Sequence, residues 1–114
     1  MTERESERGT VTAELAIGLP VVVLVLVAVL TLAAASTAQM RAMDAARAGA
    51  RALAIGEQGP AVSAVVARVG GPEAELALAH EGGWVRVTVT RPVAGGWLSG
   101  TLQATGAATA WVEP

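Results

Sequence analysis

The sequence predicts an α+β fold: a long N-terminal helix, whose first half is transmembrane, followed by a short helix and a small three-stranded antiparallel sheet. Two observations predict it. Residues 15–40 contain no charged residue and no histidine, and the C-terminal half alternates polar and apolar residues between glycine-rich breaks. An apolar run of this length favours a membrane-spanning helix, whereas alternation with a period of two favours strands.

The first nine residues form a short charged leader that ends at Gly9. It contains glutamates and arginines but no apolar residue after Met1, so we expect it to be solvent-exposed. A conventional secretory signal has an apolar stretch of only about 7–15 residues. Residues 33–35 and 36–38 nevertheless have the small side chains of a conventional cleavage site. A small secreted protein, released near Ala35 or Ala38, is therefore one alternative.

The apolar run predicts a transmembrane segment at about residues 15–35, within a helix over residues 10–55. A helix over the predicted segment would be ~31 Å long, close to the ~30 Å of the hydrocarbon core. Residues 21–30 are almost wholly valine and leucine. Pro20 removes one backbone donor, so we expect a kink or loosened turn near Ala16.

Glu14 is the single charged residue at the N-terminal end of this predicted transmembrane segment, five residues after Gly9. A charge costs roughly 2.5–3.5 kcal/mol at the centre of a membrane helix and less near the interface. One explanation is favourable interaction with the helix dipole, with Thr10 or Thr12 as the helix cap. The other is a functional carboxylate, which the charged leader and the spacing to Gly9 favour.

The string Arg8-Gly9-Thr10-Val11-Thr12-Ala13-Glu14 resembles the type IV prepilin signature. Its continuation, Leu15-Ala16-Ile17-Gly18-Leu19-Pro20-Val21-Val22, resembles the TadE-like pseudopilins of tight-adherence (Flp-type) pilus systems. Residues 43–52 are similar to the alanine- and arginine-rich segment that follows the span in such proteins. The resemblance covers residues 9–54. This sequence departs from many pilus subunits in having Leu15 at the position where they have phenylalanine.

The resemblance implies that a prepilin peptidase cleaves after Gly9 and leaves Thr10 as the mature N-terminus. Glu14 would then be the fifth mature residue and pair with the free amine of a neighbouring subunit, and Pro20 matches the family proline. The implied protein is a minor pilin-like subunit, whose partners are the peptidase, other pilin or pseudopilin subunits and the pilus assembly machinery. The leader also implies a cytoplasmic N-terminus, which the arginines cannot decide because they occur on both sides of the span.

Residues 36–55 are predicted to continue the helix, until Gly56 and Gly59-Pro60 end it. From residue 34 onward alanine recurs at every fourth position, which either permits close approach of a helix or reflects only the abundance of alanine. These alanines are Ala34, Ala38, Ala42, Ala46, Ala50 and Ala54. A short helix is predicted over residues 61–69.

The last part of the chain, residues 56–114, is predicted to be a small extracytoplasmic β-rich domain. Its expected strands are 75–79, 84–90 and 101–112, with a turn at 80–83 and an end to the second strand at Pro92. Val85, Val87 and Val89 share one face of the second strand. A domain of this size is marginal alone, so we expect the helices or neighbouring subunits to stabilise it. Trp84, Trp97 and Trp111 either lie partly buried over the sheet or form a contact patch.

The sequence offers no recognisable catalytic or cofactor chemistry. It has no cysteine and a single histidine, His80, and neither Ser63 nor Ser99 has an evident base partner. The net charge of −2 and the scarcity of aromatic residues argue against nucleic-acid binding. We therefore expect no enzyme, catalytic residue, cofactor or metal site. A single-pass membrane-anchored accessory protein that does not polymerise is the second alternative.

Overall fold

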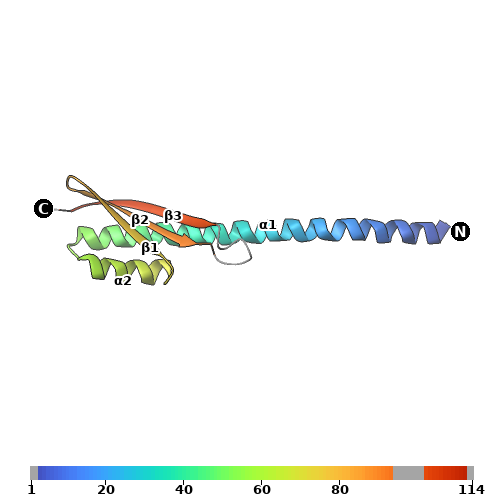
Figure 1. The fold of residues 1–114 in the computed structure, drawn as a ribbon, viewed down its shortest axis with the longest axis horizontal. Coiled ribbons are helices and arrows are strands. Elements are labelled where there is room, and N and C mark those ends of the chain that lie inside the picture. Colours follow the sequence, from blue (N-terminus) through green and yellow to red (C-terminus); the bar gives the residue numbers. More distant parts are fainter. Residues whose placement is uncertain (1–2, 94–101, 113–114) are drawn as a thin grey trace. The chain divides into compact units, whose positions relative to one another are not determined.

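The computed structural model describes residues 3–93 and 102–112, with side chains from Ser6 onward (Figure 1). Its elements are α1 (Glu3–Ala54), α2 (Gly59–Gly70), β1 (Glu75–Glu81), β2 (Trp84–Pro92) and β3 (Gln103–Trp111). The predicted α+β class is confirmed. Trp97, Ser99, the glycine break at 95–96 and the first residue of the predicted third strand lie outside the described residues.

The chain divides into two compact units, Met1–Leu32 and Ala33–Pro114, which are described separately. In the first unit, α1 begins at Glu3 and so includes the leader, seven residues or so before the predicted start at about residue 10. The Thr10 and Thr12 hydroxyls each donate a 2.9 Å hydrogen bond to a carbonyl one turn earlier, those of Ser6 and Arg8. Both threonines are thus interior helix residues, and the prediction that either caps the helix was wrong.

The C-terminal end of α1 is closed by glycine. Gly56 has a φ of +93°, a conformation that glycine adopts without steric cost. Its amide donates to the Leu53 carbonyl (3.1 Å), and the Glu57 amide donates to the Ala52 carbonyl (3.0 Å). These two bonds make the Schellman arrangement that satisfies free carbonyls at a helix end. The predicted stop at Gly56 is confirmed, with the helix ending at Ala54.

The short helix α2 follows after four residues of connecting chain and includes the predicted 61–69. Pro60 lies in its first turn, where a missing amide costs no hydrogen bond. One face, formed by Val62, Val66 and Gly70, is buried. This face makes α2 part of the core and not a surface connection.

The sheet has the order β1-β2-β3, with both pairs antiparallel. A two-residue loop, Gly82-Gly83, joins β1 to β2, and Gly82 has a φ of +61°, as the first position of a type II′ turn requires. The predicted turn over 80–83 was therefore too long, because His80 and Glu81 pair with β2. β2 ends at Pro92 as predicted.

The core of the second unit lies between one face of the sheet and the two helices, and Figure 1 shows this layering. The alternation predicted for β2 is confirmed, since Val85, Val87 and Val89 are all buried. Alanines of α1 and valines of α2 cover them: the cluster comprises Ala45, Ala46, Ala50, Ala52, Val62, Val66, Val87, Val89 and Ala110. The β-rich part is thus stabilised by the C-terminal portion of α1 and by α2, as expected for so small a domain.

The alanines spaced by four residues pack against a helix, as predicted, and also against the sheet. Ala38, Ala42, Ala46 and Ala50 are buried within the second unit, whereas Ala54 is exposed. A second cluster joins Ala38 and Ala42 to Val93 and Ala104. The close approach that small residues permit is therefore used by the sheet and α2 of the same chain.

Candidate processing and assembly segment

All four residues predicted for processing and assembly lie on α1 within the first unit. Gly9 and Thr10 are exposed, and a Cβ built on Gly9 would meet nothing within 4 Å. The peptide bond between them thus lies on an open helical surface. The Thr10 hydroxyl is occupied by its bond to the Ser6 carbonyl, on the leader side of that peptide bond.

Glu14 is exposed one helical turn after Thr10. Four residues correspond to ~6 Å along the axis, and side chains of a helix tilt toward its N-terminus. The carboxylate is thus on the same face as Thr10 and leans toward it. Among the described residues, no side-chain hydrogen bond or ion pair involves Glu14.

Pro20 is accommodated inside α1, which continues on both sides of it. Proline donates no backbone hydrogen bond, so the carbonyl of Ala16 lacks its usual helical donor. Gly18, between these two residues, has no atom within 4 Å of the position of a Cβ. The expected loosening of this turn remains a prediction, and nothing around Gly18 would obstruct it.

The apolar side chains of the first unit are exposed throughout. Their exposed fractions run from 38% at Val27 to 72% at Ile17. The helix is long and apolar enough to cross a membrane, and none of its most apolar stretch is buried. Such a surface is far larger than the apolar patches that soluble monomers expose. This N-terminal helix indicates membrane anchoring.

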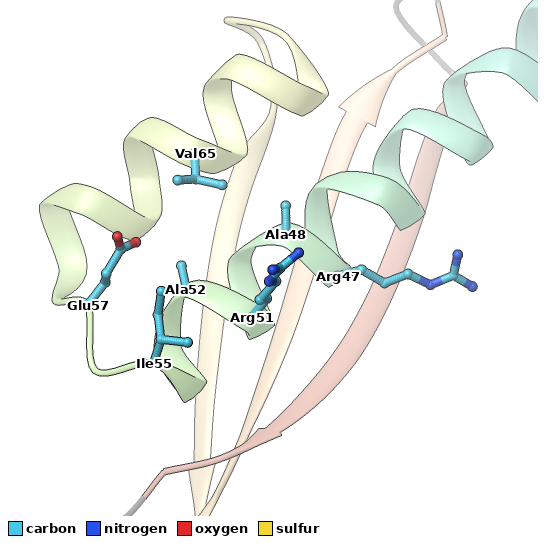
Figure 2. A pocket seen from close by; sticks show the side chains of 7 residues that line it. All are labelled: Arg47, Ala48, Arg51, Ala52, Ile55, Glu57 and Val65. Atoms are coloured by element: carbon cyan, nitrogen blue, oxygen red, sulfur yellow. The ribbon is translucent and has the colours of Figure 1, made fainter.

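The second unit has a shallow hollow of about 380 Å³ between the end of α1 and α2 (Figure 2). Its lining combines apolar and charged side chains: Ala48, Ala52, Ile55 and Val65 with Arg47, Arg51 and Glu57. Figure 2 shows the Arg47 side chain directed away from Glu57, so the two charges do not converge on one point. Among the described residues, no three His, Cys, Asp or Glu side chains gather where they could hold a metal ion.

A tryptophan pair on the sheet was not anticipated as a unit. Trp84 and Trp111 are opposite each other in the β2–β3 register, with ring centroids 5.1 Å apart and an interplanar angle of 74°. This is the edge-to-face arrangement that aromatic rings favour. The rings are 52% and 50% exposed. They lie on the outer face of the sheet, where the two rings pack against each other and Trp111 also lies close to Gly83.

Comparison with known proteins finds a similarity in the same segment that contains the sequence motifs. The family model described as "TadE-like protein" matches residues 9–51, which include Gly9, Thr10, Glu14 and Pro20. Neither the curated proteins nor the solved structures gave a match. The matched segment is less than half of the chain and contains the apolar helix and the arginine- and alanine-rich part of α1. Over residues 9–51 the chain is similar to TadE-like proteins, in agreement with the resemblance that the sequence motifs carry.

Proposed function

We propose that this chain is a minor pilin-like subunit of a tight-adherence pilus, processed after Gly9 by a prepilin peptidase and assembled through its N-terminal helix. One observation carries the proposal. The exposed apolar surface over residues 11–32 contains a single charged side chain, Glu14, and the whole of it lies inside the TadE-like match. A helix of this kind must be covered by lipid or by other helices.

Electrostatics supports a role for processing in assembly. A carboxylate in an apolar environment needs a cation close by. Cleavage after Gly9 would remove Arg4 and Arg8, and the next arginine, Arg41, is ~40 Å farther along a helix. The α-amine created on Thr10 would then be the nearest cation on the mature chain, and identical amines would be available on neighbouring subunits.

The division of α1 into two kinds of surface supports assembly through its N-terminal part. In the second unit the alanines of α1 are covered by the chain's own sheet. In the first unit the large apolar side chains are exposed in the part of the chain that the structure describes. Packing between subunits would therefore use residues 11–32, while the second unit presents the outer face of its sheet. The proposed role is structural and not enzymatic.

The proposed orientation has the leader in the cytoplasm and the second unit outside. A cytoplasmic prepilin peptidase site requires the leader on that side, and a folded unit outside the membrane would be available to the fibre. Protease protection in intact spheroplasts tests it: external protease should degrade the second unit and leave the apolar helix.

Intact mass spectrometry of the native protein tests the processing. A mass lower by residues 1–9 supports cleavage after Gly9. An unchanged mass would favour the accessory membrane protein, and loss of everything up to Ala35 or Ala38 would favour the secreted protein. A Gly9→Leu variant should retain the leader, because its bulky side chain occupies the position next to the peptide bond. A Gly18→Leu variant, with equally open surroundings, is the matched control and should still lose the leader.

A further inference from the structure

A second, smaller hollow in the second unit brings two arginines together. It has a volume of about 230 Å³ and is lined by Ala34, Thr37, Ala38 and Arg41 of α1 and by Arg91 near the end of β2. No carboxylate contributes to this lining. The Thr37 hydroxyl donates its one hydrogen to the Ala33 carbonyl (3.1 Å), so the two guanidinium groups are the positively charged groups of the lining. Two positive charges thus border one small, partly apolar hollow.

The Arg91 guanidinium is only partly satisfied. Its Nη1 donates a 2.8 Å hydrogen bond to the Gly70 carbonyl, which anchors the side chain to the end of α2. Its Nε is buried and has no acceptor among the described residues. A buried donor without a partner costs about 1–3 kcal/mol. A guanidinium group binds phosphate oxygens through its N–H donors, and Arg91 is one of the residues that line the hollow.

The position of the hollow along α1 selects one source of phosphate. The hollow begins at Ala34, at the predicted end of the membrane segment, and Arg41 is ~9 Å beyond residue 35 along the helix. The polar headgroup layer on each side of the hydrocarbon core is ~5–8 Å thick. A long arginine side chain that leans toward the N-terminus of its helix reaches back into that layer.

We propose that Arg41 and Arg91 form a binding site for the phosphate of an anionic lipid headgroup. The lipid fixes the second unit at the membrane surface through one headgroup bound between α1 and β2. The proposal needs residues 15–35 to lie in a membrane, and it is independent of cleavage after Gly9 and of pilus assembly. If the lipid-binding proposal fails, the mass-spectrometric test of cleavage after Gly9 keeps its meaning.

The test uses the full chain in neutral detergent micelles and native mass spectrometry with short-chain phosphatidylglycerol or phosphatidylcholine. We expect the unmodified chain to retain phosphatidylglycerol preferentially. Arg41→Gln and Arg91→Gln should each reduce that retention roughly tenfold or more, as expected for loss of a charged hydrogen bond. Arg86→Gln is the matched control, since Arg86 is exposed on β2 and does not line the hollow. It should leave lipid retention unchanged.

Three results would overturn the proposal. The first is equal retention of the two lipids. The second is that Arg86→Gln reduces phosphatidylglycerol retention as much as Arg41→Gln and Arg91→Gln do. The third is displacement of phosphatidylglycerol by inorganic phosphate at a similar concentration, which would indicate a site for free anions. Arg91→Gln also removes the bond to Gly70, so circular dichroism must show that it folds. If it does not fold, Arg41→Gln decides, because Arg41 is exposed and outside both core clusters.

Discussion

Gly106 of β3 lies directly against the backbone of Ala42 in α1. A Cβ built on Gly106 would be only 2.5 Å from the Ala42 carbonyl oxygen, a separation that real structures do not tolerate. Ala42 is itself completely buried. The sheet therefore approaches α1 as closely as it does because the strand has no side chain at this position and the helix has a methyl group.

The first prediction concerns this contact. Gly106→Ala should destabilise the second unit by about 1–3 kcal/mol, because the added methyl group meets backbone and not a flexible side chain. The melting temperature of the full chain in detergent, followed by circular dichroism, should fall by ~4 °C or more. Gly59→Ala is the control, since a Cβ there meets nothing within 4 Å. Equal melting temperatures for the two variants would show that the sheet can move away from α1 at little cost.

The sequence predicted the elements well and their contacts less well. Alternation in β2 identified its buried valines, because a strand with one buried face has a period of two. The third strand contains Gly106, and only the fold reveals that this glycine approaches the backbone of Ala42. Likewise, the alanines of α1 predicted close packing and gave no sign that the partner is the chain's own sheet.

The residues of the candidate site were identified from the sequence, and the fold adds little to that identification. Gly9, Thr10, Glu14 and Pro20 were identified from spacing and resemblance, and on α1 they are simply exposed helix positions. Their proposed roles depend on a peptidase, a membrane and a second subunit, none of which a single chain contains. Conversely, the arginine-lined hollow joins Arg41 to Arg91, fifty residues or so apart in sequence, and only tertiary structure brings them together.

The second prediction concerns the end of α1. Gly56→Ala should cost about 1–2 kcal/mol, because a side chain is unfavourable at its positive φ even though the surrounding space is open. Chemical denaturation should show a lower midpoint with an unchanged slope. Gly56→Asn should recover part of the loss, since asparagine tolerates this conformation better. Failure of asparagine to exceed alanine would contradict the conformational explanation.

The third prediction concerns the tryptophan pair. A double-mutant cycle with Trp84→Ala and Trp111→Ala should give a coupling of about 0.5–1.5 kcal/mol, the contribution expected of an edge-to-face pair. Gly83 reinforces the geometry, because a Cβ there would be 2.5 Å from the Trp111 ring. The matched cycle pairs Trp111→Ala with Thr90→Ala, which is remote on β2, and should be additive. Additivity in both cycles would mean that the two rings stabilise the sheet independently.

The fourth prediction concerns Glu14, and it rests on the proposed pairing with a freed α-amine. Glu14→Gln keeps the size of the side chain and removes its charge. Insertion into the membrane should be unchanged or easier, because an amide is less costly than a carboxylate in lipid. Assembly should suffer, since the amine of the neighbouring subunit would remain buried without a counter-charge. Losing one partner of a buried pair costs about 3–5 kcal/mol, equivalent to a reduction of ~100-fold or more.

The measurement is the amount of subunit in sheared surface fibres, compared with the amount in membranes. Glu7→Gln is the matched control, because this leader carboxylate would be removed with residues 1–9 and its loss should leave incorporation unchanged. The mass of the membrane-bound Glu14→Gln chain separates two explanations for a defect. A chain that still carries its leader would show that Glu14 acts in recognition by the peptidase, and the pairing role would then be wrong. A processed chain that stays in the membrane is the result that pairing requires.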